Sequence, residues 1–185
     1  MPVTLGTERL ILREPDDADA AVLLDYYNRN EPRLAPWEPE HDGDVAQQLR
    51  WIAWRKGESA IDHGRSFLAF DRADPSALVA VVNVYDITRG QVHMAMLGYS
   101  ADGAYEGKGY AREAVEALVL YAFGTLNLHR LTANYQPTNG RSAALLRRLG
   151  FAVEGYSRDL VHLRGAWRDH VMTSLINPLW VPPER

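Results

Sequence analysis

The sequence predicts an α+β, or mixed, fold rather than a doubly wound parallel sheet. Strand-like runs come in groups and only partly alternate with helical segments. Three of these runs follow one another between residues 66 and 100, as in a meander. A glycine-rich stretch, residues 102–109, then leads into an amphipathic helical segment. The expected element order is β-α-α-β-β-β-α-β-α-β-β.

The first third of the chain is expected to supply one strand and two helices. Arg9–Arg13 (RLILR) has the composition of a short strand. Pro15 and the two aspartates after it open a helix that we expect to end near Tyr27, because acidic residues stabilise a helix N-terminus. A proline-broken loop should occupy Arg33–Glu40, and a second helix should run over Asp44–Ile61.

The middle of the chain carries the meander and its following helix. The three strands are expected at Ser66–Asp71, Leu78–Tyr85 and Val92–Ser100, with a turn at Asp86–Gly90. Apolar residues recur at helical spacing over Ala111–Phe123, which predicts a helix with one buried stripe.

The last third is expected to add a strand, a short helix and closing strands. His129–Tyr135 is a strand, and Thr138 or Asn139 can cap a helix over Ser142–Leu149. Glycine at position 150 ends that helix. The closing strands are expected at three places, joined by a hairpin turn at residues 164–165 and followed by a proline-rich tail at residues 177–185. They are Phe151–Glu154, Leu160–Leu163 and Trp167–Leu175.

The composition fits one globular domain spanning residues 1–185. Apolar residues make up 46% and charged residues 24%, and a chain of this length buries a sizeable core. The absence of cysteine excludes disulfides, thiolate metal sites and a cysteine nucleophile, and we expect no metal. The formal net charge of −4 weighs against a nucleic-acid partner. We see neither a membrane-spanning run nor a signal peptide, so we expect a cytoplasmic protein without a membrane partner.

The most informative stretch is YSADGAYEGKGYAR, residues 99–112. A strand ends, glycines follow and a helix begins, so unpaired N–H groups and the helix dipole create a site for an anion. Gly107 and Gly109 allow a bulky phosphate to approach the backbone, while Lys108 and Arg112 add positive charge. A plain strand-to-helix connection is the alternative. The nucleoside-triphosphate and dinucleotide glycine patterns are both absent.

Residues 106–111, EGKGYA, resemble the Q/R-x-x-G-x-G/A signature of the GNAT superfamily of N-acetyltransferases, with Glu106 as the departure from it. The resemblance implies the GNAT fold, a mostly antiparallel twisted sheet flanked by helices. It also implies that backbone amides of this loop hold the diphosphate of acetyl-CoA, the co-substrate. The expected cofactor-binding residues are Tyr99, Ser100, Ala101, Gly107, Lys108, Gly109, Tyr110, Ala111, Arg112, Asn139 and Ser142.

The second half of the superfamily pattern is NYQPTNGRSAALLRRLGF, residues 134–151. In the superfamily, the asparagine at the position of Asn139 bonds the pantetheine arm. In related ribosomal-protein acetyltransferases, a serine at the position of Ser142 lies near the CoA sulfur. A plain helix N-cap and a first-turn helix residue are the respective alternatives.

The resemblance extends over nearly the whole chain, from about Thr7 to Trp180. TERLILRE, APWEP, HMAMLGYS, HRLTANYQPTN and GAWRDHVMTSL are similar to the RimJ/RimL group of ribosomal-protein N-acetyltransferases. Membership of that group implies acetyl transfer to the N-terminal α-amine of a ribosomal protein, with alanine as the expected first residue.

The residues favour direct attack by the amine on the thioester over an acyl-enzyme, because there is no cysteine and no evident His-Asp support for Ser142. Asn134 and Leu146 stand where some relatives carry a glutamate base and a tyrosine acid. An α-amine, with a pKa of about 7.7–8.0, is neutral on the order of a tenth of the time near pH 7 and needs little help, unlike lysine. By resemblance, a bulged strand at Leu97–Tyr99 is expected to offer an N–H to the thioester carbonyl.

The candidate catalytic residues are Ser142, as a hydrogen-bond donor to the thiolate, and His93, as a proton handler. Arg33, Trp37 and Tyr135 are the candidate acceptor-binding residues. Ordinary core or surface roles are the alternatives for His93, Trp37 and Tyr135.

Two other functions remain compatible with the sequence. The same CoA site would serve an enzyme that acetylates a small amine such as an antibiotic, a polyamine or an amino acid. The altered Glu106 and the missing base are also compatible with a CoA-binding or ribosome-associated protein that has no turnover. Both a monomer and a homodimer are compatible with the sequence.

Overall fold

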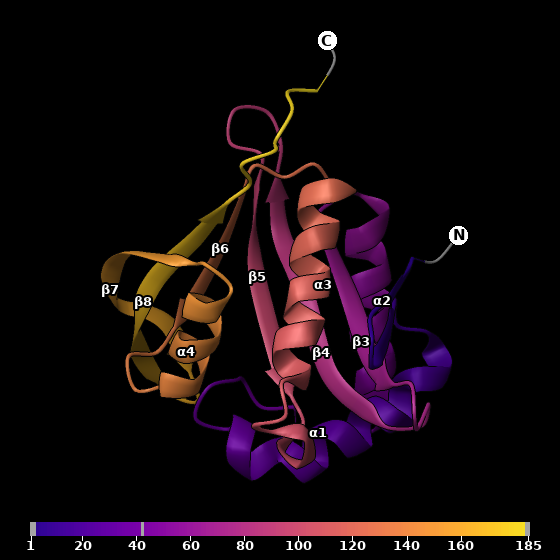
Figure 1. Ribbon diagram of the computed structural model, residues 1–185. Helices are drawn as coiled ribbons and strands as arrows, with labels where there is room; N and C mark the ends of the chain where they lie inside the picture. The colour runs from indigo at the N-terminus through magenta and orange to yellow at the C-terminus, as the bar shows by residue number, and fades with distance from the viewer. Residues whose placement is uncertain (1–2, 42, 184–185) are drawn as a thin grey trace.

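The computed structural model describes residues 3–41 and 43–183. Over these residues the chain forms one eight-stranded sheet in the order β1-β2-β3-β4-β5-β6-β8-β7 (Figure 1). The strands are β1 (Thr4–Gly6), β2 (Leu10–Arg13), β3 (Gly64–Asp71), β4 (Leu78–Thr88), β5 (Met94–Ala101), β6 (Arg130–Tyr135), β7 (Ala152–Leu163) and β8 (Ala166–Ile176). The helices are η1 (Asp17–Asp19), α1 (Ala20–Leu34), α2 (Val45–Ala60), η2 (Gly103–Tyr105), α3 (Tyr110–Gly124) and α4 (Gly140–Arg148).

Two helical layers cover the two faces of the sheet. One core packs α3 against strand residues such as Leu12, Val82 and Leu131. A second core packs α1 and α2 against Leu68 and Val81 on the other face. Val81 and Val82 reach opposite cores because successive strand side chains point to opposite faces. Figure 1 accordingly shows α3 and α4 in front of the sheet and α2 behind it.

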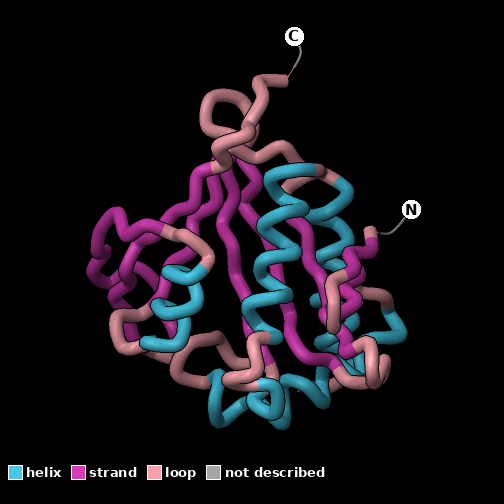
Figure 2. The backbone as a smooth tube through the Cα atoms, in the orientation of Figure 1, coloured by secondary structure: helices cyan, strands magenta, loops and turns pink. Residues whose placement is uncertain are grey.

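The sheet splits between β5 and β6. These parallel strands pair only from Met94 opposite Arg130 to Met96 opposite Thr132 in the described structure. Beyond that point β5 stays paired with β4, and β6 stays paired with β8. The two strands therefore diverge toward their C-terminal ends, as the tube in Figure 2 shows. All the other neighbouring strands are antiparallel, which confirms the predicted mixed fold class.

Helix α1 is longer than the sequence predicted. It continues past Tyr27 and through Pro32 to Leu34, so the expected loop begins only at Ala35. The helix persists because its buried stripe continues: Leu34 is buried, and the buried side chain of Asn30 donates to the carbonyl of Tyr26. These contacts outweigh the loss of one helix hydrogen bond at the proline.

Three strand boundaries also differ from expectation. β1 was not predicted. β4 continues to Thr88, across an irregularity next to Asp86, whose φ is 53°. β7 is one long strand instead of two, because register shifts between Val153 and Gly155 and between Ser157 and Val161 absorb the segment expected as a break. The predicted hairpin at residues 164–165 is confirmed, with φ of 48° and 79°, as a two-residue turn between twisted strands favours.

Candidate active site

The loop before α3 presents backbone N–H groups that have no partner. Gly107 and Gly109 have φ of 73° and 84°, which glycine adopts without a Cβ clash, and Gly109 caps α3. Within the described residues, the N–H groups of both glycines lack a hydrogen-bond acceptor. The N–H groups in the first turn of α3 also have no hydrogen-bond acceptor inside the helix. With the helix dipole, these donors fit a diphosphate such as that of acetyl-CoA.

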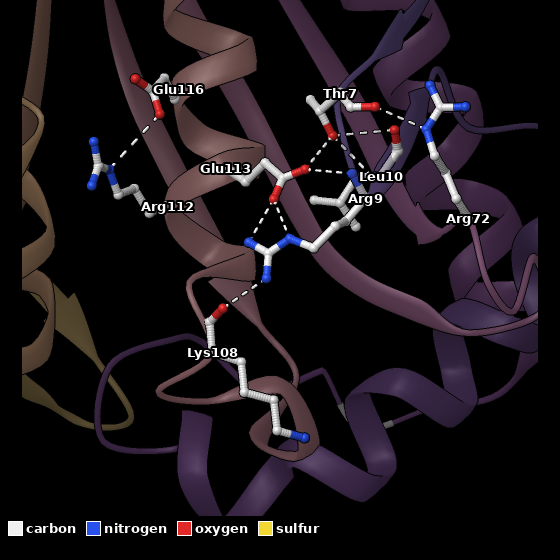
Figure 3. A network of polar contacts seen from close by, with 8 residues as sticks. All are labelled: Thr7, Arg9, Leu10, Arg72, Lys108, Arg112, Glu113 and Glu116. Carbon is white, nitrogen blue, oxygen red and sulfur yellow. Dashed lines mark hydrogen bonds and ion pairs between the residues drawn. The ribbon is translucent and has the colours of Figure 1, made fainter.

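A polar network ties this loop to the hairpin of β1 and β2 (Figure 3). Nη1 of Arg9 donates to the carbonyl oxygen of Lys108 at 2.8 Å, and Nε of Arg9 donates to Glu113 at 2.6 Å. Glu113 also accepts from the Thr7 hydroxyl at 2.6 Å. Because C=O and N–H of a trans peptide point in opposite directions, the bond to Lys108 aims the N–H of Gly109 away from Arg9.

Glu106, the departure from the family signature, forms an ion pair across to α4. Its Oε1 lies 2.7 Å from Nε of Arg141 in the first turn of α4. The carboxylate therefore faces a cation and not the diphosphate donors. Lys108 and Arg112 are exposed, as ligands of a phosphate would be.

Tyr99 and Ser142 form a hydroxyl pair where α4 begins. Their oxygens lie 2.7 Å apart. Burial raises the pKa of Tyr99 to about 12, although its bond with Ser142 opposes the shift, so the phenol is protonated at neutral pH. Asn139 caps α4, with its Oδ1 accepting from the Ser142 N–H at 3.1 Å. Cap and hydroxyl pair together place the Ser142 side chain at the split in the sheet.

A cavity of about 370 Å³ extends through the split between β5 and β6. Tyr99, Asn139 and Ser142 line the side that α3 and α4 cover. Trp37 and Trp51 line the other side, toward α1 and α2. A thioester and an amine can thus reach one another from opposite faces of the sheet.

Three residues form a row across the cavity on the face covered by α1 and α2. Asn83 of β4 pairs with Gly98 of β5, and continuing the β5–β6 register places Asn134 level with Gly98. Residues directly opposite one another share a face of the sheet. Gly98 carries no side chain, so the space between the two carboxamides stays open to the cavity.

The segment between α1 and α2 covers this acceptor side. Trp37, Glu38 and His41 line the cavity. The His41 ring stacks on Tyr27 with 3.7 Å between centroids, and its Nε2 lies 3.1 Å from a Glu38 carboxylate oxygen. Burial raises the pKa of Tyr27 well above its ordinary value, so its hydroxyl stays neutral. The acceptor side is therefore aromatic, with one carboxylate that already has a partner.

Two side chains from distant strands hold this covering segment. Nε2 of Gln136, just after β6, donates to the carbonyl oxygen of Pro36 at 2.8 Å. Nε of Arg164, in the β7–β8 turn, donates to the carbonyl oxygen of Glu38 at 3.1 Å. The segment that covers the cavity is thus held by the residue that follows β6 and by the turn between β7 and β8.

His93 is not brought to the site, which contradicts its predicted role. It lies immediately before β5, at the end opposite Tyr99, and does not line the cavity. Its ring packs 5.2 Å from the Trp180 ring, and its carbonyl oxygen accepts from the His129 N–H. The sequence placed His93 within the strand expected at residues 92–100, but β5 begins one residue later, at Met94, and runs away from His93 toward the split.

Arg33 is also misplaced by the sequence prediction. It lies in the last turn of α1 and packs against Gly103, and it does not line the cavity. Trp37 and Tyr135 do line it. Among the predicted cofactor residues, Ser100 accepts a hydrogen bond from Tyr26 of α1.

Ala101, Tyr110 and Ala111 complete the predicted cofactor residues. The Ala101 and Tyr110 side chains pack against the core under α3. Arg9 covers the Tyr110 ring at 4.2 Å. Ala111 occupies the first turn of α3, where its backbone N–H adds to the donors of the loop.

The expected bulge at Leu97–Tyr99 is absent from the described β4–β5 ladder. Pairing runs without interruption from Val84 opposite Leu97 to Ala80 opposite Ala101. The irregularity lies instead near Asp86 of β4. The edge of β5 facing β6 nevertheless loses its strand partner after Met96, so free backbone donors arise from the split itself.

Sequence reasoning missed several residues that line the cavity, among them Asn83, Glu38, His41 and His170. Strand alternation alone identifies which side of a strand Asn83 and His170 occupy, but not which strands border the split.

In the described residues, no group of three or more His, Asp or Glu side chains is arranged to hold a metal ion. Across the same part of the chain, no helix is long and apolar enough to span a bilayer.

Comparison with known proteins agrees with this geometry. A family model described as an acetyltransferase (GNAT) domain matches residues 9–152. The chain is 40% identical over 182 residues to the ribosomal protein uS5-alanine N-acetyltransferase of Escherichia coli, across 97% of this chain and 94% of that protein. These matches confirm the resemblance to the RimJ/RimL group found in the sequence.

Solved structures share the whole fold. The structure of the ribosomal-protein-S5-alanine acetyltransferase from Vibrio fischeri superposes with a TM-score of 0.90 at 33% identity, covering 97% of this chain and 100% of that one. Mycobacterium smegmatis RimJ in complex with CoA-disulfide has a TM-score of 0.86 at 24% identity, covering 95% and 88%. The second match supports the fold alone.

Proposed function

We propose, from the fact that the chain belongs to the GNAT acetyltransferase family, that it acetylates the N-terminal α-amine of a ribosomal protein beginning with alanine. Family membership makes the protein an acetyl-CoA-dependent N-acetyltransferase. The observation that carries the choice of acceptor is the 40% identity, over nearly its full length, with an enzyme named for the alanine of uS5.

The chemistry of the acceptor side supports an α-amine. Glu38 is the only carboxylate among the described residues that line the cavity, and it is close to His41. Arg55 adds a cation to the same lining, so the cavity is not the acidic pocket that a polyamine would favour. An α-amine is already partly neutral near pH 7, whereas a lysine amine requires a strong base.

The two-sided cavity supports direct transfer within one domain. Backbone donors before α3 bind the diphosphate, and the Tyr99–Ser142 pair offers a hydrogen bond to the departing thiolate. The amine approaches from the side of Trp37. Both substrates are held together, so the nitrogen forms its bond to the acetyl carbon as the carbon–sulfur bond breaks. Both sides of the site come from one chain. A ribosomal substrate would also be consistent with a cytoplasmic enzyme.

The first prediction is acetylation of an alanine-initiated peptide. The purified protein is incubated with acetyl-CoA and a peptide carrying the N-terminal sequence of the host uS5 protein, and the product is analysed by mass spectrometry. We expect a gain of one acetyl group at the α-amine. The matched control is the same peptide with its α-amine blocked and a lysine left free, which should remain unmodified.

Two results would reject this acceptor. One is an unmodified α-amine beside a modified lysine. The other is turnover of spermidine or another small amine with none of the peptide, which would make the protein a small-molecule acetyltransferase.

A further inference from the structure

His170 is a cavity residue that the family signature leaves without a role. It lies on β8, is 9% exposed and lines the acceptor side of the cavity. Its Nδ1 lies 3.0 Å from the carbonyl oxygen of Arg168. A carbonyl only accepts, so Nδ1 carries the proton and Nε2 of the neutral ring keeps its lone pair. Nε2 has no hydrogen-bond partner among the described residues and keeps contact with solvent.

Strand register places His170 on the same face as the row of Asn83, Gly98 and Asn134. Asn134 pairs with Met172 across β6 and β8, and His170 is the next β8 residue on that side. The ring therefore lies in the cavity lining, on the same face of the sheet as Asn134.

The row contains two acceptor atoms that need a donor. Oδ1 of Asn83 and Oδ1 of Asn134 are buried and have no hydrogen-bond partner in the described structure. A buried carbonyl oxygen without a donor costs about 1–3 kcal/mol. A neutral amine supplies two N–H donors, so it can give one to either oxygen and keep the other for a proton acceptor while its lone pair faces the split.

The other ionisable groups of the cavity are poorly suited to take a proton from that amine. Glu38 and His41 are close to one another, and Arg55 is a cation. Burial raises the pKa of Tyr27, Tyr85 and Tyr99. Among the described residues, the ionisable groups that line the cavity are Tyr27, Glu38, His41, Arg55, Tyr85, Tyr99, Tyr135 and His170.

We infer that His170 is the catalytic proton acceptor, and that Asn83 and Asn134 are positioning residues that hold the amine for it. This inference rests on the proposed function only for the identity of the amine. As the nitrogen–carbon bond forms and the carbon–sulfur bond breaks, the proton leaving the nitrogen goes to Nε2 of His170. The thiolate accepts a hydrogen bond from the Tyr99–Ser142 pair and takes a proton from solvent on release.

The second prediction tests His170→Asn. The asparagine amide can keep the bond to the Arg168 carbonyl, but it has no basic nitrogen. We expect kcat to fall about 100-fold, within the range for removal of a general base. The limb of the pH profile due to the imidazole should disappear, while calorimetry shows unchanged affinity for CoA. His170→Gln, with the same loss of activity, serves if the asparagine variant does not fold.

His162→Asn is the matched control, because His162 lies on the same hairpin, is exposed and is not part of the cavity. It should leave kcat unchanged. Wild-type-like kcat and pH profile in His170→Asn would overturn the inference while leaving the acceptor proposal intact. If the parent enzyme modifies only a small amine, the variants are assayed with that amine. A fall in kcat there supports the role of His170 although the acceptor proposal has failed.

Discussion

At the scale of single residues, the hydroxyl pair of Tyr99 and Ser142 supports the proposal that a hydrogen bond, and not a strong acid, assists departure of the thiolate. The phenol stays protonated because burial raises its pKa to about 12, so the pair always carries a proton to donate. A donor that contacts charge developing on sulfur accelerates the reaction more than it strengthens binding.

The third prediction follows from this pair. Ser142→Ala should lower kcat by about 10–100-fold, because one pre-placed donor is lost, while affinity for acetyl-CoA changes little. Steady-state kinetics with calorimetric titration of CoA would separate the two effects. Tyr99→Phe should lower kcat by a smaller factor in the Ser142→Ala background than in the wild type, because the two hydroxyls act together. An unchanged kcat in Ser142→Ala would remove Ser142 from the mechanism.

Single residues also show where sequence reasoning succeeds. The turn at Gly107 and Gly109, the Asn139 cap and the place of Ser142 in a first helical turn could be predicted, because each depends on local order along the chain. The proposed role of His170 was not recognisable, because it depends on the register of β8 against β6, whose paired residues lie 36 to 46 positions apart in the sequence. The same limit applies to the other cavity residues found only in the structure.

At the scale of elements, the β1–β2 hairpin acts as a brace for the cofactor loop. Arg9 joins the carbonyl of Lys108 to Glu113 on α3 (Figure 3). Burial raises the pKa of Glu113, but hydrogen bonds from Thr7 and Arg9 lower it by more, so the pKa lies below its ordinary value. The carboxylate therefore remains charged and keeps its ion pair with Arg9. The orientation of the Gly109 N–H therefore depends on an element distant in sequence.

The fourth prediction tests this brace. Arg9→Ala should raise the KM for acetyl-CoA about 10-fold. Without the bond from Arg9, the peptide between Lys108 and Gly109 can rotate, and the Gly109 N–H then no longer points toward the diphosphate. The KM for the acceptor peptide should stay the same. Arg72→Ala is the matched control, since it removes the same charge and a bond to Thr7 of the same hairpin without touching the loop. An equal effect of both substitutions would mean that the loss of one positive charge changes the KM, and not the loss of the Arg9 contacts with the loop and α3.

Elements were predicted well where a local pattern sets them and poorly where packing does. The helix over residues 110–124 and the strands of the meander follow from apolar spacing. The extension of α1 through Pro32 depends on buried contacts of Leu34, and the continuity of β7 depends on pairing with β8. The split between β5 and β6 has no local signal, because it arises when each strand keeps its other neighbour.

At the scale of the whole molecule, the site joins two separately packed halves. The core under α3 supports the cofactor loop, and the core under α1 and α2 supports the acceptor side. Buried tyrosines link these cores to the split: Tyr26 bonds to Ser100 on one face and Tyr99 to Ser142 on the other. Burial raises the pKa of both phenols, so both stay neutral in the folded state.

The fifth prediction is that the folded protein loses stability at alkaline pH, in part because Tyr99 in the site is forced to ionise. An unfolded tyrosine ionises near pH 10, whereas Tyr99 holds its proton to about pH 12 when folded. The folded state therefore binds more protons above pH 10, so its free energy of unfolding falls as pH rises from 10 to 12. Urea titrations at pH 9 and pH 11 would measure the fall. Tyr99→Phe should reduce it, and an exposed control, Tyr156→Phe, should change it less because Tyr156 is 56% exposed. A fall of the same size in all three proteins would show that Tyr99 does not couple the site to folding.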